Sequence, residues 1–230
     1  MSLYSIGLLD DEDMDIANIK LAIKINWPDK DNLPVINCYE VNDSIEGMEK
    51  KITNVIENEI IDCLLIDSRI VAEPKLINGD GIVARLSDRF LKFPFIVLTV
   101  VSSEVLLRNK VDPDKVYEKQ KFTKVDSDDS RLYVQKIFNN INQYKNGLIE
   151  LKKERKELED AVHKLNDSKP NLQEDVMEAY SKLWSLDMKQ SLYDGFQVEN
   201  PSSNTIKESL ENLSDVFSRV EDELKRIKNV

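Results

Sequence analysis

The chain has 230 residues, which is enough for one domain of ordinary size followed by a second element. Hydrophobic residues make up 41% of the chain, charged residues make up 33%, and the formal net charge is −11. Because no segment gathers positive charge, we expect no nucleic-acid partner. No apolar run approaches the roughly 18 residues that span a bilayer, and the N-terminus has no signal-peptide pattern. We therefore expect a cytoplasmic protein with no membrane partner.

Residues 1–125 have the pattern of a domain in which strands alternate with helices. Five short apolar runs predict strands at 4–9, 34–41, 61–66, 94–99 and 115–118. Segments with helical spacing lie between these runs, and such alternation is typical of β-α-β units and a parallel sheet. The third and fourth runs are continuously apolar, which indicates strands buried on both faces. The expected fold is therefore an α/β domain with a five-stranded, parallel, doubly wound sheet.

Residues 126–230 have the pattern of an all-α tail. Apolar residues between 137 and 165 step by four and by three, with Arg155 as the single polar member. This spacing predicts a coiled-coil seam. Two further helices are expected, at about 172–192 and at 206–227. The three helices could pack on each other, on a second copy of the chain or on a partner.

Chemically active side chains follow the predicted strands. Asp10 and Asp11 follow the first strand, Asp67 ends the third, Thr99 ends the fourth and Lys119 follows the fifth. Ligands of open parallel sheets bind beyond the carboxyl ends of the strands, so we expect these side chains to lie together. Crowded carboxylates favour a bound cation, and oxygen ligands suit Mg²⁺. A carboxylate can also attack phosphorus if nearby positive charge neutralises the phosphoryl oxygens.

Four motifs carry these residues in a fixed order along the chain. They are Leu8-Leu9-Asp10-Asp11-Glu12, Leu64-Leu65-Ile66-Asp67, Ile96-Val97-Leu98-Thr99 and Val116-Tyr117-Glu118-Lys119. Together they resemble the receiver domain of bacterial two-component response regulators, and the likeness covers roughly residues 3–125. The resemblance implies a flavodoxin-like fold for residues 1–125.

The resemblance also implies a chemistry for the strand ends. Asp67 would accept a phosphoryl group from a phosphohistidine of a sensor histidine kinase, while Thr99 and Lys119 would hold that group. Mg²⁺ would be bound by Asp10, Asp11, Asp67 and the backbone carbonyl of Arg69.

The chain departs from the family's pattern at several positions. Gln120 stands where the family usually has a proline after the lysine, and Val100 stands where a small residue usually follows the threonine. The family's switch aromatic corresponds to Val116, whereas Tyr117 lies one place later. The segment 68–80 is longer than usual, and we expect a lid or a docking loop there.

No recognisable output domain follows the receiver-like part, so we expect a signalling protein rather than an enzyme. Its partners would be the sensor kinase, possible effector proteins and a second copy of the chain, which would pair through the tail as a homodimer.

One alternative is an inactive receiver that serves as a coiled-coil adaptor. A second alternative is a phosphatase of the aspartyl-phosphate type, but such enzymes usually have a second aspartate where this chain has Arg69.

Overall fold

The computed structural model describes most of the first 194 residues, which belong to one compact unit. The described residues are 3–39, 41, 44–72, 75–107, 111–167 and 173–194. The third tail helix that the sequence predicts at 206–227 lies outside these residues.

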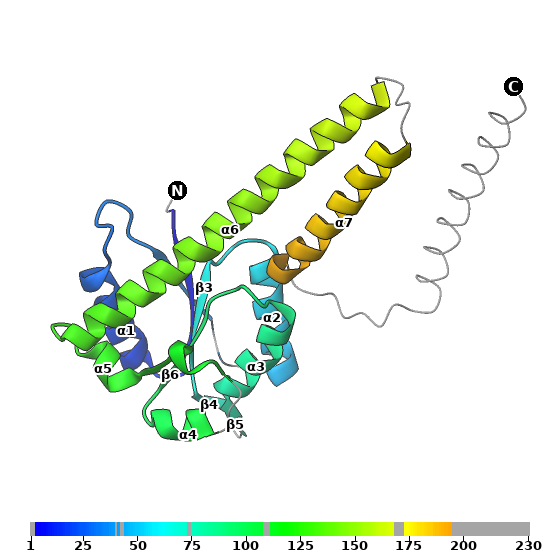
Figure 1. Cartoon of the computed structure of the whole chain (residues 1–230). Coiled ribbons are helices and arrows are strands. Elements are labelled where there is room, and N and C mark those ends of the chain that lie inside the picture. The colour runs from blue at the N-terminus through cyan, green and yellow to red at the C-terminus, as the bar shows by residue number, and fades with distance from the viewer. Residues whose placement is uncertain are drawn as a thin grey trace, which may run out of the picture. The chain divides into compact units, whose positions relative to one another are not determined.

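Five parallel strands form the central sheet, in the order β2-β1-β3-β6-β7. They are β1 (Ser5–Leu9), β2 (Val35–Tyr39), β3 (Cys63–Asp67), β6 (Phe95–Thr99) and β7 (Val116–Glu118). Figure 1 shows β3 and β6 of this sheet with the helices around them. The chain adds β2 on one side of β1, and β3, β6 and β7 on the other side. This order is that of the doubly wound, flavodoxin-like folds. The predicted α/β class and the five-stranded parallel sheet are confirmed.

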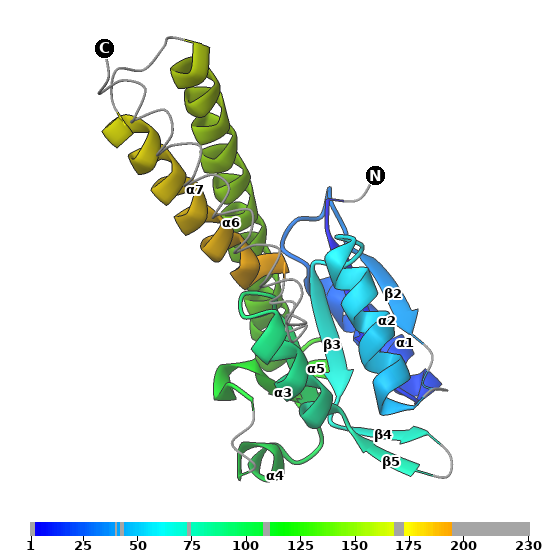
Figure 2. The same cartoon turned by 90° about the vertical axis from the view of Figure 1, so that its right-hand side faces the viewer.

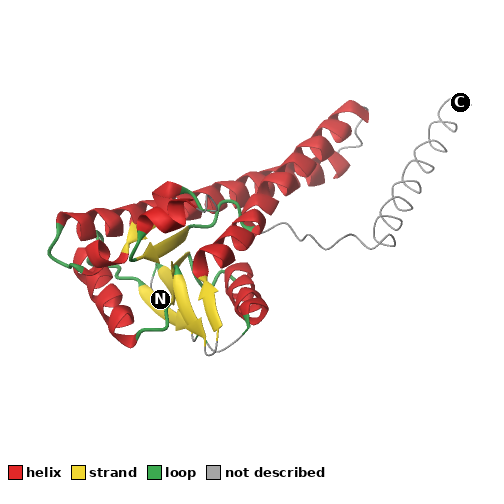
Figure 3. Ribbon diagram, turned by 90° about the horizontal axis from the view of Figure 1, so that it is seen from below, coloured by secondary structure: helices red, strands yellow, loops and turns green. Residues whose placement is uncertain are grey.

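Helices cover both faces of the sheet (Figure 3). One face carries α1 (Asp13–Asn26), α5 (Lys119–Thr123) and the first half of α6 (Asp128–Asp167), and the other carries α2 (Ile45–Glu57) and α3 (Gly79–Arg89). Two short helical segments, α4 (Ser102–Leu107) and η1 (Pro113–Lys115), follow β6 in the chain, and η1 leads directly into β7. Successive side chains of β3 enter opposite clusters of buried residues, which explains its continuously apolar sequence.

The segment that the sequence analysis assigned to a lid or docking loop is a β-hairpin. Strands β4 (Arg69–Ala72) and β5 (Lys75–Asn78) pair antiparallel between β3 and α3. Figure 2 shows this hairpin beyond the arrowhead of β3, at the carboxyl end of the sheet. The chain closes back on β3 at Gly79, whose N–H donates to Ser68 O at 3.0 Å. A Cβ atom at Gly79 would lie 1.9 Å from Asp67 O, so only glycine permits this approach.

Helix α6 is the longest element, and at about 1.5 Å per residue its 40 residues extend about 60 Å. Ile137 and Ile141 pack with α1 in one buried cluster, while Tyr144 and Leu148 pack in the other cluster. Next to Tyr144 in the chain, Lys145 places Nζ 2.8 Å from Asp62 Oδ1, beside the start of β3. The helix therefore crosses the amino ends of the strands. The first part of the predicted seam is buried against the α/β core.

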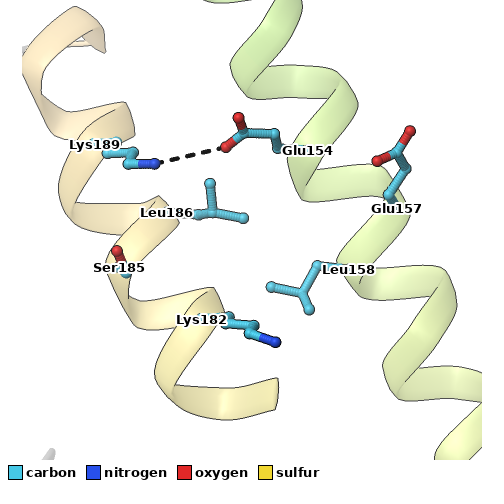
Figure 4. Close-up of a pocket in the computed structure, with 7 residues that line it drawn as sticks. All are labelled: Glu154, Glu157, Leu158, Lys182, Ser185, Leu186 and Lys189. Carbon is cyan, nitrogen blue, oxygen red and sulfur yellow. Dashed lines mark ion pairs between the residues drawn. The ribbon is translucent and has the colours of Figure 1, made fainter. Parts of the chain in front are cut away.

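Helix α7 (Gln173–Asp194) runs antiparallel beside the second half of α6. Figure 4 shows Leu158 and Leu186 facing one another across the groove between these helices, and Glu154 paired with Lys189 at 3.7 Å. At the other end of α7, the ring of Tyr193 packs against Tyr144. None of the described helices is both long enough and apolar enough to cross a membrane.

The tight passage at Gly79 predicts a large cost for one added methyl group. We expect Gly79→Ala to lower the free energy of unfolding by about 2 kcal/mol or more, because the new Cβ must displace the backbone of Asp67. The matched control is Gly81→Ala, whose Cβ would meet no atom closer than 3.9 Å and which should be neutral or slightly stabilising. Urea unfolding measures both variants, and an equal loss in the two would contradict the close approach.

The packing of α6 predicts that its first half contributes to the stability of the α/β core. Ile137 is fully buried, so Ile137→Ala should cost about 2–5 kcal/mol of unfolding free energy. Leu132 lies on the same helix but is 51% exposed, so Leu132→Ala should cost less than about 1 kcal/mol. Similar small losses in both variants would show that α6 does not pack on the sheet.

Candidate functional site

Four of the side chains predicted at the strand ends converge at the carboxyl edge of the sheet. In the parallel register Leu9 lies opposite Ile66, and Asp67 lies opposite Leu98. The residue after β1, the last residue of β3 and the residue after β7 therefore reach the same edge. The structure brings together Asp10, Asp11, Asp67 and Lys119.

Lys119 is the centre of this site. It is the first residue of α5, is only 5% exposed, and places Nζ 2.6 Å from Asp67 Oδ2 and 2.9 Å from Asp10 Oδ2. A third carboxylate, that of Asp15, lies 2.5 Å away. Burial alone would lower the pKa of Lys119, but its contacts with Asp15, Asp67 and Asp10 outweigh burial and raise this pKa above its usual value. The ammonium group is therefore charged and faces three carboxylates.

Asp10 is a buried carboxylate whose two oxygens differ in their contacts. Its Oδ1 atom accepts the N–H of Glu12 at 3.0 Å, whereas Oδ2 is buried and accepts no hydrogen bond among the described residues, despite its proximity to Lys119. Burial raises the pKa of Asp10 above its usual value, although the Glu12 N–H and the Lys119 ammonium act in the opposite direction. A cation beside this carboxylate would stabilise its charged form.

Three carboxylates are close enough to hold a metal ion together. Asp10, Asp11 and Asp67 each offer one oxygen, and these oxygens lie within 4.8 Å of one another. Asp10 and Asp67 are buried, whereas Asp11 is exposed. Charged oxygen ligands with one side open to solvent suit a hard divalent cation that keeps part of its water shell. The buried Oδ2 of Asp10, which accepts no hydrogen bond from the described residues, also fits this use.

Asp15 is a site residue that the sequence analysis missed. It lies in the first turn of α1 rather than at a strand end, so the strand-end rule did not include it. Asp10 and Asp11 precede α1, so no helical spacing relates Asp15 to them, and the sequence alone gives no signal that Asp15 reaches Lys119.

The hairpin contacts two of the carboxylates through its backbone. The N–H of Arg69 lies 3.2 Å from Asp67 Oδ1, and the N–H of Val71 lies 3.2 Å from Asp11 Oδ2. The Arg69 side chain extends away from the site to form an ion pair with Glu104 of α4. Strand β4 therefore lies along the carboxylates, and the predicted metal contact of the Arg69 carbonyl stays a prediction.

Thr99 and its neighbours border the site from β6. Thr99 is buried, and its Oγ1 accepts the N–H of Val101 at 3.2 Å. Val100, which stands where receiver domains usually have a small residue, is exposed.

Tyr117 links the site to the long helix. It is buried in β7, two residues before Lys119, and its ring stacks on that of Tyr133 with centroids 4.4 Å apart and planes 3° apart. Tyr133 belongs to α6, so the strand that leads to Lys119 and the long helix share one aromatic contact.

Comparisons of the chain with protein-family models, with curated proteins and with solved structures found no match. The function proposed below therefore rests on the geometry of the site and on the chemistry of its side chains.

The raised pKa of Asp10 predicts an unusual dependence of stability on pH. The pKa of Asp10 in the folded state lies above the usual 3.8. The contribution of Asp10 to the stability of the fold is therefore complete below pH 3.8, and it is lost as the pH rises through the folded-state pKa. In cation-free buffer at pH 7, Asp10→Asn should therefore be more stable than the wild type.

Urea unfolding between pH 4 and pH 7 measures this difference, which should grow as the pH rises. Asp13→Asn is the matched control because Asp13 is exposed in the neighbouring turn of α1. If Asp10→Asn is no more stable than this control at pH 7, the ionised Asp10 does not cost stability.

Proposed function

We propose that this chain is a receiver protein that accepts a phosphoryl group on Asp67 from the phosphohistidine of a sensor histidine kinase. One observation carries the proposal: the buried Lys119 ammonium lies 2.6 Å from Asp67 Oδ2 at the carboxyl edge of a parallel sheet, next to Asp10 and Asp11. Together they supply a carboxylate nucleophile, a cation for the phosphoryl oxygens and acids that could bind a metal ion.

In the proposed transfer, a carboxylate oxygen of Asp67 attacks the phosphorus atom of the donor. The new O–P bond forms as the P–N bond breaks, and the electron pair of that bond returns to the imidazole, which takes up a proton. Lys119 stabilises the negative charge on the phosphoryl oxygens, and the Thr99 hydroxyl donates a hydrogen bond to one of them. The chain acts on no substrate of its own, so it is a phosphoacceptor rather than an enzyme.

The cation of this site is proposed to be Mg²⁺, held by Asp10, Asp11 and Asp67 together with the carbonyl of Arg69. When bound, it neutralises charge on the phosphoryl oxygens and on the attacking carboxylate. Oxygen ligands and an exposed side at Asp11 support Mg²⁺ over metals that prefer nitrogen or sulfur ligands.

The output of the protein is proposed to be protein–protein contact through the helical tail. The stacked pair Tyr117 and Tyr133 supports coupling between the site and α6. On α7, Trp184 and Met188 lie four residues apart and are 70% and 50% exposed, which supports a binding surface for an effector or for a second copy of the chain. We also propose that the protein is cytoplasmic.

A second candidate function is an adaptor whose receiver-like part takes no phosphoryl group. The N–H groups of Arg69 and Val71 already engage Asp67 and Asp11, and this contact favours a closed site. In such an adaptor the receiver-like part would serve as a docking module and the helical tail would make the further contacts.

Acetyl phosphate distinguishes the two candidates. With Mg²⁺ present, the wild type should gain the mass of one phosphoryl group, and hydroxylamine should remove it because an acyl phosphate is labile to this nucleophile. Asp67→Asn should gain nothing, since an amide oxygen is a poor nucleophile. Intact-protein mass spectrometry measures both proteins.

Beryllofluoride with Mg²⁺ provides an independent measurement, because a ligand that binds only the folded state raises the midpoint of thermal unfolding. The wild type should show this rise and Asp67→Asn should not. Wild-type protein that neither gains mass nor responds to beryllofluoride would leave the adaptor as the function.

A further inference from the structure

The unusual feature of this site is the aspartate on α1. Asp15 Oδ2 lies 2.5 Å from Lys119 Nζ, and the side chain is about a quarter exposed. Asp15 is therefore a third carboxylate on the ammonium, in addition to Asp10 and Asp67. Asp11 lies beside Asp10 and Asp67 rather than on the ammonium, so the site as a whole holds four carboxylates and one ammonium, a formal excess of three negative charges.

The ammonium group has only three hydrogens to donate. In the structure its three close contacts are all carboxylate oxygens. A phosphoryl group on Asp67 would take over the Lys119 contact of that carboxylate, and a cation would draw on the charge of Asp10. Asp15 is not one of the three carboxylates that could hold a metal ion together. A bound cation would therefore leave the ion pair between Asp15 and Lys119 in place.

Building on the proposed function, we infer that Asp15 is a positioning residue that competes with the phosphoryl group for the Lys119 ammonium. Its charge lowers the affinity of the site for phosphoryl-type anions and raises the affinity for divalent cations. The two effects have opposite signs because anion and cation respond in opposite directions to the same negative charge.

Asp15→Asn tests the inference, because the amide keeps the size of the side chain and its oxygen can still accept a hydrogen bond from Lys119. The first measurement is the Kd of Mg²⁺ alone by titration calorimetry. The second is the Kd of beryllofluoride at saturating Mg²⁺. We expect beryllofluoride to bind roughly tenfold more tightly and Mg²⁺ to bind several-fold more weakly, the size expected for one charge at this distance.

Asp13→Asn is the matched control, because it removes the same charge from the same turn of α1 at an exposed position. It should leave both affinities close to those of the wild type. Asp15→Ala, which removes the hydrogen-bond acceptor as well as the charge, should reproduce the opposite shifts seen with Asp15→Asn.

Several outcomes would overturn the inference. Unchanged affinities in Asp15→Asn would do so, as would a parallel loss of both affinities, because damage to the fold weakens both ligands together. Equal shifts in Asp13→Asn would assign the effect to net charge rather than to the contact with Lys119. If the wild type fails to bind beryllofluoride, the proposed function fails and the inference falls with it, whereas wild-type binding with no shift in Asp15→Asn refutes the inference alone.

Discussion

The buried ammonium of Lys119 is the contact on which the carboxyl edge of this protein depends. Carboxylates from three places in the chain, the residue after β1, the last residue of β3 and the first turn of α1, lie within 3 Å of it. Without this cation, buried carboxylates would face one another at short range, and their repulsion and desolvation would disfavour the fold. The same ammonium is the group best placed to receive a phosphoryl oxygen, so stability and proposed chemistry depend on one side chain.

Two elements close the ends of the sheet and differ in how they are held. The β4–β5 hairpin has only two strands, and such hairpins are marginally stable alone. Its backbone contacts with Asp67 and Asp11 therefore link its order to the state of the site. Helix α6 closes the opposite end through buried side chains of both clusters, including Ile141 and Tyr144. The stacked rings of Tyr117 and Tyr133 join β7 to the first half of α6.

Much of the fold and part of the site could be predicted because they leave local signals. Continuously apolar runs identified β3 and β6, and helical spacing identified the helices between the strands. The strand-end rule then placed Asp10, Asp67 and Lys119 together, since the carboxyl ends of neighbouring parallel strands share one edge.

The sequence by itself determined the type of each main element and the set of acids that follow the strands. Only the tertiary structure decided that Asp15 reaches Lys119, that the 68–80 segment pairs as a hairpin and that the sheet covers the first half of the α6 seam. The heptad spacing indicates that one face of α6 is buried. The same spacing would result whether a second helix or a sheet covers that face. The covering surface comes from residues distant in sequence, and periodicity carries no information about them.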